Sequence, residues 1–174
     1  MPYNERFPEQ WKAIQGAIDL SNKSVLDLGC GYGDMVMAVH EIGGWVTGVD
    51  NNSDMVNIAR NRLVGRGIPE QFIVEADITN LGPAWDKADW DVIVCFSVLP
   101  YIEDYSSLLL WIARHSKKAL LEIQAKGDGP GISRGDGETR DVLSAYFNNV
   151  RPIGRTLVTY RNIYRTIWLC DNVV

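Results

Sequence analysis

The chain has 174 residues, a formal net charge of −5 at pH 7 and a hydrophobic fraction of 46%. This length and composition are typical of one globular domain with a full core, here residues 1–174. No apolar stretch approaches the ~20 residues that span a bilayer. The polar N-terminus lacks the hydrophobic core of a signal peptide. Enzymes that act on nucleic acids are usually more basic than this chain. We therefore expect a cytoplasmic protein that does not enter membranes, with nucleic acid as the less favoured partner.

The cysteines and histidines give no sign of a disulfide framework or a metal site. Cys30, Cys95 and Cys170 are scattered along the chain without a C-x-x-C pair, which indicates free thiols in a reducing compartment. His40 and His115 fall on separate predicted helices, and neither has a metal-ligand partner at local spacing. We expect no bound metal.

Helical and extended patterns alternate along the chain. The residue pattern predicts helices at 8–19, 34–43, 53–64, 105–115 and 139–147. It predicts strands at 24–28, 45–49, 71–75, 91–95, 118–124, 149–153 and 163–170, with a turn-prone link between the last two. Such alternation predicts an α/β fold with a mostly parallel sheet and helices on both faces.

The first strand passes directly into a glycine-rich turn. Asp27 is followed by Gly29, Gly31 and Gly33, which gives D-x-G-x-G-x-G, and a helical pattern begins at Asp34. Glycines let the backbone take positive φ and let a ligand lie against it, and the following helix N-terminus would face that ligand. The G-x-G-x-x-G fingerprint of nicotinamide and flavin enzymes needs glycine where Asp34 stands, and an anion at a helix N-terminus disfavours a pyrophosphate there. The turn therefore favours a cationic ligand.

Two further strands end in an acidic residue. Asp50 closes the second strand, where a carboxylate beside the first strand can accept from both hydroxyls of a ribose. Asn51 follows it, and Met55 comes one turn into the next helix, where a core role is as well supported as contact with an adenine. Asp77 follows the third strand. A ribose contact alone does not separate one adenosine-containing cofactor from another.

With Asp27, Asp50 and Asp77 each ending a β-type run, the chain resembles the class I S-adenosylmethionine (SAM)-dependent methyltransferases over about residues 24–124. The resemblance implies a doubly wound seven-stranded sheet of order 3-2-1-4-5-7-6 with the last strand antiparallel, and a lid from segment 1–20 over the cofactor site. It implies SAM as cofactor, with S-adenosylhomocysteine (SAH) as its product. The residues it implies for cofactor binding are Asp27, Gly29, Cys30, Gly31, Gly33, Asp50, Asn51, Met55, Asp77, Ile78 and Phe96.

The loop after the fourth strand normally faces the transferred methyl group in this family. Here Pro100-Tyr101 stand where many small-molecule methyltransferases carry histidines, and the N/D-P-P-Y/F and P-C motifs of amino and cytosine methyltransferases are missing. Positioning alone can supply much of the catalysis of methyl transfer, so no base is assigned. Candidate catalytic groups are Tyr101, Glu122 and Asp128, and candidate substrate-side residues are Tyr3, Arg6, Tyr101 and Arg161.

The C-terminal part of the chain is basic and contains a glycine-rich segment. Residues 126–137 include five glycines and follow the fifth strand, so they form either a loop over the substrate or a plain connector. Within 142–170 there are four arginines and no acid, which suits a carboxylate or phosphate. We favour the alternative, that these arginines are solvated or pair with acids elsewhere. We expect Tyr101, segment 126–137 and Arg161 to border one pocket, where Arg161 would serve an anionic acceptor.

We expect a methyltransferase that acts on a small molecule, because little sequence is inserted between the core elements to bind a large one. Two alternatives stay open: a methyltransferase on a nucleic acid or protein, and a SAM-binding or SAM-degrading protein without transferase activity. The acceptor atom and the oligomeric state do not follow from the sequence.

Overall fold

The computed structural model describes residues 5–82, 85, 89–125, 131–132, 134–158 and 163–172. In chain order, the elements are α1 (Phe7–Gln15), β1 (Ser24–Leu28), α2 (Asp34–Glu41), β2 (Trp45–Asp50), α3 (Ser53–Val64), η1 (Glu70–Phe72), β3 (Ile73–Glu75), β4 (Trp90–Phe96), η2 (Leu99–Tyr101), α4 (Tyr105–His115), β5 (Ser116–Gln124), α5 (Asp136–Ser144), β6 (Asn149–Val158) and β7 (Ile163–Asp171). Here η marks a short 3₁₀ helix.

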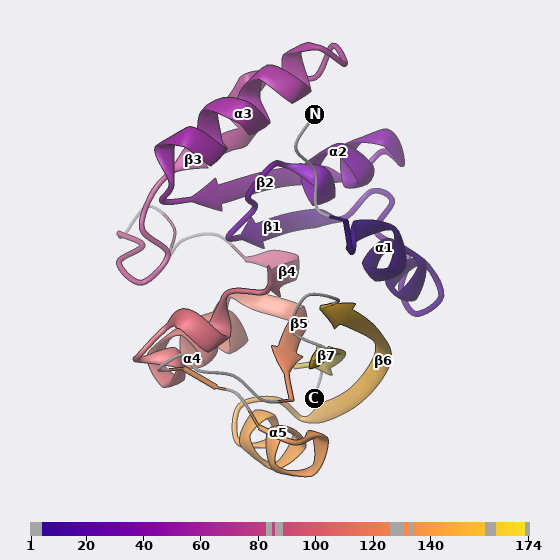
Figure 1. The fold of residues 1–174 in the computed structure, drawn as a ribbon, viewed down its shortest axis with the longest axis vertical. Helices are drawn as coiled ribbons and strands as arrows, with labels where there is room; N and C mark the ends of the chain where they lie inside the picture. The colour runs from indigo at the N-terminus through magenta and orange to yellow at the C-terminus, as the bar shows by residue number, and fades with distance from the viewer. Residues whose placement is uncertain are drawn as a thin grey trace.

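The strands form a seven-stranded sheet of order β3-β2-β1-β4-β5-β7-β6. Strand β7 is antiparallel to both β5 and β6, while the pairs among β1 to β5 are parallel. Figure 1 shows this order from β3 at the top to β6 at the bottom. The predicted fold class and strand order are confirmed.

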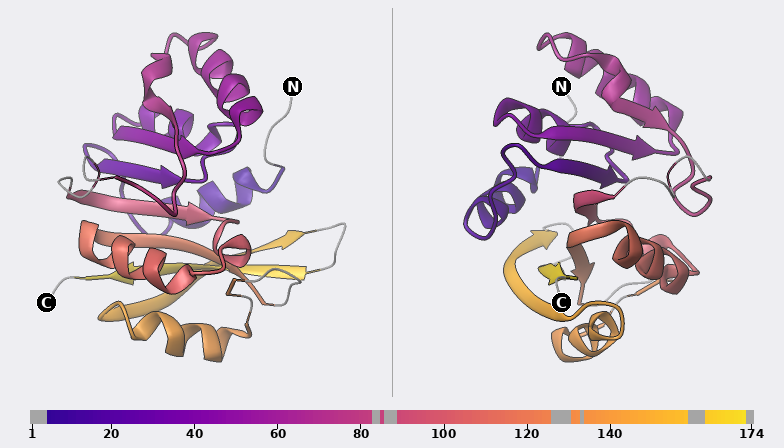
Figure 2. Two further views of the ribbon diagram at one scale, coloured as in Figure 1. Left: turned by 90° about the vertical axis from the view of Figure 1, so that its left-hand side faces the viewer. Right: turned by 180° about the vertical axis from the view of Figure 1, so that it is seen from behind.

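The sheet separates two hydrophobic layers, because successive residues of a strand point to opposite faces. Val25, Val94 and Leu120 belong to the layer under α1, α2 and α3. Leu26 and Leu121 belong to the layer under α4 and α5. The left view of Figure 2 accordingly shows α4 in front of the sheet and α1 behind it.

The C-terminal hairpin differs from the prediction. Strand β6 was expected over 149–153 but runs to Val158, past a bulge between Pro152 and Gly154. Proline cannot donate to the ladder, and the bulge lets pairing resume beyond it. A Cβ on Gly154 would lie 2.7 Å from the Ala13 side chain, so glycine lets α1 pack closely on this strand. The predicted long link is therefore wrong, and Arg161 lies outside the described residues.

The bounds of three helices also differ, and α2 ends at Glu41 rather than at residue 43. The first helix ends at Gln15 rather than at residue 19: the Gly16 N–H donates to the Lys12 carbonyl, and the N–H groups of Ala17 and Ile18 both donate to the Ile14 carbonyl, which closes the last turn. The last helix occupies Asp136–Ser144 rather than 139–147. The three cysteines are buried and free, as predicted. Within the described residues, no helix is both long enough and apolar enough to cross a bilayer.

Candidate functional site

The turn after β1 has the backbone that its glycines predict. Gly29, Gly31 and Gly33 have φ values of 76°, 50° and 77°. A Cβ on Gly29 would lie 2.2 Å from the Val98 side chain, whereas a Cβ on Gly31 would meet nothing within 4 Å. Gly29 is therefore required for packing, and Gly31 leaves open backbone for a ligand. Gly33 faces Leu63 on α3, 3.2 Å from where its Cβ would be.

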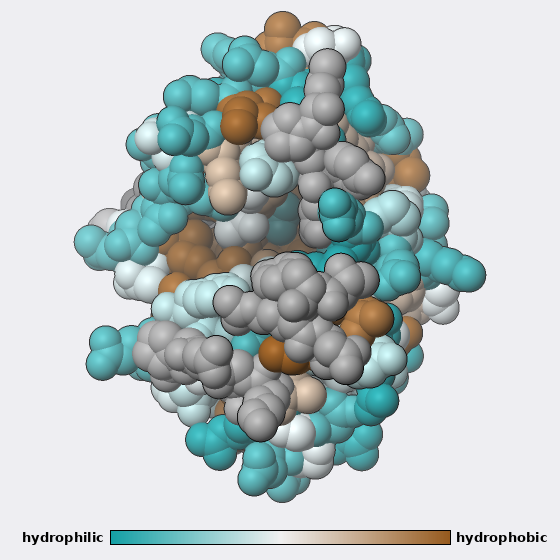
Figure 3. All heavy atoms as spheres, viewed as in Figure 1, coloured by the Kyte–Doolittle hydropathy of each residue, from teal (hydrophilic) through white to brown (hydrophobic). Residues whose placement is uncertain are grey.

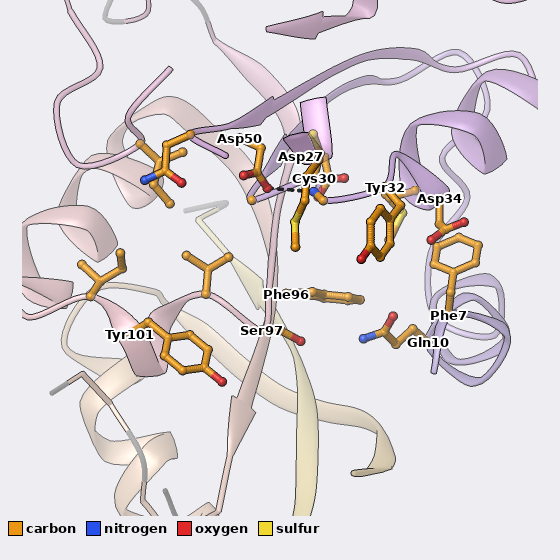
Figure 4. A pocket seen from close by; sticks show the side chains of 18 of the residues that line it. Phe7, Gln10, Asp27, Cys30, Tyr32, Asp34, Asp50, Phe96, Ser97 and Tyr101 are labelled. Carbon is orange, nitrogen blue, oxygen red and sulfur yellow. Dashed lines mark hydrogen bonds between the residues drawn. The ribbon is translucent and has the colours of Figure 1, made fainter. Parts of the chain in front are cut away.

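A cavity of about 650 Å³ opens beside this turn, a size within the usual range of small-molecule sites. It is visible as the hollow near the centre of Figure 3, and Figure 4 shows it from close by. Every residue predicted for cofactor binding lines it except Gly33. The lining is Arg6, Phe7, Gln10, Asp27, Gly29, Cys30, Gly31, Tyr32, Asp34, Met35, Asp50, Asn51, Met55, Asp77, Ile78, Thr79, Phe96, Ser97, Val98, Tyr101 and Ile102.

Asp50, at the end of β2, anchors the glycine turn. One carboxylate oxygen accepts from the Gly31 N–H and the other from the Asn52 N–H, both at 2.9 Å; Figure 4 shows Asp50 beside the turn. Each carboxylate oxygen offers about two lone-pair sites. One site on each oxygen therefore remains for the two hydroxyls of a ribose.

Asp27 is a buried carboxylate with unmet hydrogen-bonding capacity. Asp27 is only 4% exposed. No side chain or backbone group of the described residues donates a hydrogen bond to its carboxylate. Burial, with the negative charges of Asp50 and Asp34, raises the pKa of the Asp27 carboxyl to about 7. Since an unpaired buried charge is costly, this carboxylate fits a cationic donor such as the ammonium of an amino acid.

Asp34 does not provide the bare anion that the sequence argument used against pyrophosphate. Its Oδ1 lies 2.6 Å from Arg62 Nη2, and Arg62 Nη1 donates to the Tyr32 carbonyl at 2.6 Å. Arg62 thus offsets the Asp34 charge and ties the glycine turn to α3. The preference for a cation at this site rests on Asp27 instead.

Asp77 lies at the exposed rim of the cavity. Its Oδ1 accepts from both the N–H and the hydroxyl of Thr79, at 2.9 and 2.8 Å. This local turn fixes the side chain and leaves the second oxygen available. Ile78 is buried beside it. Both residues line the cavity.

The opposite side of the cavity is built on Glu122, a fully buried residue of β5. Glu122 Oε2 accepts from Arg6 Nη1 at 2.9 Å and from Ser97 Oγ at 2.5 Å. Glu122 Oε1 accepts from Gln10 Nε2 at 2.8 Å and from Thr156 Oγ1 at 2.7 Å. We call Arg6, Gln10, Ser97, Glu122, Thr156 and the neighbouring Arg165 the floor cluster.

The floor cluster gives Glu122 a structural role. Burial raises the pKa of the Glu122 carboxyl, but the Arg6 charge and three side-chain hydrogen bonds outweigh burial and leave that pKa below its ordinary value. Glu122 lies behind Ser97 and Arg6 and does not line the cavity. A buried carboxylate of low pKa is a poor proton acceptor, so the geometry does not support Glu122 as a base.

The other acceptor-side candidates divide into two groups. Tyr101 lines the cavity and is 54% exposed, which places it at the rim. Arg6 also lines the cavity, where its hydrogen bond to Glu122 makes it part of the floor cluster. Tyr3, Asp128 and Arg161 lie outside the described residues. The described start of the glycine-rich segment packs against η2, where Gly131 N–H donates to the Pro100 carbonyl at 3.0 Å.

Several cavity residues were not predicted. Phe7 and Gln10 reach the site because α1 begins beside it, and no local motif marks that placement. Ser97 follows β4 with φ of 63°, unusual for a non-glycine residue; its position in the exit loop was the available signal. Two of the C-terminal arginines lie near acids: Arg155 pairs with Asp136, and Arg165 lies near Glu122. This agrees with the favoured alternative, in which these arginines are solvated or pair with acids elsewhere in the fold.

Comparison with known proteins agrees with this geometry. Residues 25–119, more than half of the chain, match a family model described as a methyltransferase domain. Ubiquinone biosynthesis O-methyltransferases of Proteus mirabilis and Coxiella burnetii are 30% and 32% identical over 109 and 97 residues, or 62% and 56% of this chain and 44% and 40% of theirs. The chain thus spans about half the length of the curated relatives it matches.

Two solved structures have the same fold. Magnesium protoporphyrin IX methyltransferase from Synechocystis PCC 6803, with bound SAM, matches with a TM-score of 0.70 at 20% identity, over 96% of this chain and 77% of that one. EvdMO1 matches with a TM-score of 0.75 at 17% identity, over 99% of this chain and 42% of that one. From the match over residues 25–119, the chain belongs to the methyltransferase domain family.

Proposed function

We propose that the chain binds SAM in this cavity and transfers its methyl group to a small-molecule acceptor. The observation that carries the proposal is Asp27, a buried carboxylate that lines the cavity without a donor from the described residues. An ammonium group supplies both the missing hydrogen bonds and the missing charge. A dinucleotide offers a pyrophosphate instead, which would face Asp27 with like charge.

Each part of the cavity has a task in this proposal. Asp27 holds the ammonium, Asp50 the ribose hydroxyls, and Asp77 with Ile78 the adenine, while Gly31 lets the ligand approach the backbone. The start of α1, where Arg6 and Phe7 line the cavity, would serve as the lid in this proposal. The cofactor supplies an activated methyl group on a sulfonium, whose leaving group is a neutral thioether. The remaining residues need only hold the acceptor in line and exclude water.

Small-molecule acceptors are favoured by the relatives, whose names include ubiquinone biosynthesis and magnesium protoporphyrin IX methyltransferases. The acidic overall charge also disfavours nucleic acid. The three free, buried thiols suit a cytoplasmic location. The acceptor atom and the oligomeric state are outside the proposal.

Calorimetric titration with SAH and with NAD tests the cofactor assignment. We expect SAH to bind with the wild-type chain and NAD to give no heat of binding. Binding of NAD without a response to SAH would overturn the proposal. Incubation with SAM alone separates the remaining alternative, because a SAM-degrading protein releases products other than SAH without any acceptor.

A further inference from the structure

The glycine turn after β1 must be held in place by contacts from outside it. Its three glycines, Gly29, Gly31 and Gly33, all have positive φ, and glycine loses more conformational freedom on folding than any other residue. The ligand of the proposed function lies against this backbone. Its affinity therefore depends on the fraction of molecules in which the turn has the conformation that binds.

Helix α3 supplies one set of these contacts. Arg62 Nη1 donates to the Tyr32 carbonyl and Arg62 Nη2 donates to Asp34 Oδ1, each at 2.6 Å. The side chains of Arg62 and Asp34 are 14% and 13% exposed, so their contact is largely shielded from water. The planar guanidinium thus fixes two groups at once, one on each side of Gly33.

The same helix also packs against the turn. A Cβ on Gly33 would lie 3.2 Å from Leu63 Cδ1 and 3.3 Å from Ala59 Cβ, so the last two turns of α3 lie directly against it. The turn has a second attachment at the end of β2, where Asp50 accepts from the Gly31 N–H. Asp50 therefore holds the turn at Gly31, and α3 holds the residues that follow.

We infer that Arg62 is a positioning residue for the cofactor, which holds the glycine turn in the conformation that accepts SAM. Tyr32 and Asp34 line the cavity, whereas Arg62 is not among the described residues that line it. Figure 4 shows Tyr32 between Cys30 and Asp34. Arg62 thus acts on the ligand through the turn and not by direct contact. The inference rests on the proposed function and concerns the affinity of that site for its cofactor.

Arg60 provides a matched control on the same helix. It also makes two hydrogen bonds to backbone, from Nε at 3.2 Å and from Nη2 at 3.0 Å, both to the Ile73 carbonyl. Arg60 and Arg62 are both half-buried. Each arginine therefore ties α3 to a neighbouring segment, Arg62 to the glycine turn and Arg60 to β3.

Calorimetric titration of the full chain with SAH compares the variants at a temperature where circular dichroism shows each to be folded. Arg62→Gln should weaken SAH binding about tenfold, as expected if the turn then has its binding conformation about a tenth of the time. Arg62→Lys keeps the charge but loses the planar fork, so its affinity should fall between those of Arg62→Gln and the wild type. Arg60→Gln should bind SAH within about twofold of the wild type, because its lost contacts lie away from the turn.

Amide hydrogen exchange of the ligand-free chain tests the positioning role without a ligand. Exchange in a peptide covering residues 29–34 should be faster in Arg62→Gln than in the wild type, because local opening controls exchange. The same peptide in Arg60→Gln should exchange as in the wild type. Saturating SAH should reduce the difference for Arg62→Gln, since the ligand selects the held turn.

Equal SAH affinity for the wild type and folded Arg62→Gln would overturn the inference, and so would an equal loss of affinity in Arg60→Gln. If Arg62→Gln does not fold, Arg62→Lys decides the question: wild-type affinity with unchanged exchange at 29–34 would then overturn the inference. Failure of the wild type to bind SAH would overturn the proposed function instead, while the exchange measurement still tests whether Arg62 holds the turn.

Discussion

Asp27 and Glu122 are two buried acids of one sheet with opposite surroundings. Asp27 on β1 is 4% exposed and receives no hydrogen bond from the described residues, and its pKa is raised to about 7. Glu122 on β5 is fully buried but accepts from four side chains, and its pKa is lowered. Partners, and not burial, decide the role of each. Side chains of the protein fill the acceptor sites of Glu122, whereas we expect a ligand to fill those of Asp27.

The largest expected effect on stability comes from removing the charge of Glu122. Glu122→Gln leaves the buried Arg165 and the half-buried Arg6 without their shared carboxylate, so we expect the free energy of unfolding to fall by about 3–5 kcal/mol. Urea denaturation measures this. The matched control is Glu41→Gln, which breaks the exposed pair with Arg66 and should change stability by less than about 1 kcal/mol. Equal losses in the two variants would erase the distinction between the acids.

Asp27→Asn should act in the opposite direction and depend on pH. A raised folded-state pKa means that the wild type loses stability as the pH rises from about 4 to about 7, since only the unfolded chain ionises freely. The stability advantage of Asp27→Asn over the wild type should therefore grow by about 3 kcal/mol between pH 4.5 and pH 8. Urea denaturation at the two pH values measures it. An advantage that is constant with pH would contradict the raised pKa.

The two glycines of the turn should separate folding from binding. Gly29→Ala must fit a Cβ 2.2 Å from Val98 at positive φ, so we expect a loss of about 2 kcal/mol or more in stability. Gly31→Ala meets no protein atom and should cost about 1 kcal/mol from its φ alone, yet weaken SAH binding at least tenfold. Thermal unfolding and calorimetry measure the two effects. Normal SAH affinity in folded Gly31→Ala would place the ligand elsewhere.

Among the acids that line the cavity, Asp50→Ala should weaken SAH binding more than Asp77→Ala. Asp50 has one acceptor site left on each oxygen for the ribose, while Thr79 already occupies one oxygen of Asp77. At about 1–3 kcal/mol for each unsatisfied group, we expect a loss of roughly 30-fold for Asp50→Ala and roughly fivefold for Asp77→Ala. Similar affinities for the two variants would show that β2 does not carry the ribose contact.

The acidic side of the cavity, which holds the three aspartates at the strand ends, was predictable because its residues follow strand ends in the sequence. Asp27, Asp50 and Asp77 each close a β-type run, and parallel strands bring such ends to one edge of the sheet. The strand order came with the resemblance, which the same residues support. Local motif and topology therefore sufficed for this half of the site.

The floor cluster could not be predicted in the same way. Arg6 and Glu122 are 116 residues apart, and their pairing depends on how α1 crosses the sheet near β6. Close packing of α1 on Gly154 and the bulge at Pro152 set that placement. Neither feature leaves a periodic signal, so Glu122 was assigned a candidate catalytic role and Gln10 was missed. The Asp34 argument failed for the same reason, since its partner Arg62 is distant in sequence.

Counting protons during SAH binding tests most directly the claim that Asp27 awaits a cationic ligand. Calorimetry at pH 6.5 in two buffers of different ionisation enthalpy measures the number. Because the free Asp27 carboxyl has a pKa of about 7 and an ammonium favours its ionised form, the wild type should release about half a proton or more per SAH bound. Asp27→Asn should release none, and Asp77→Ala should release as many as the wild type. SAH binding without proton release by the wild type, or with equal release by Asp27→Asn, would contradict the account.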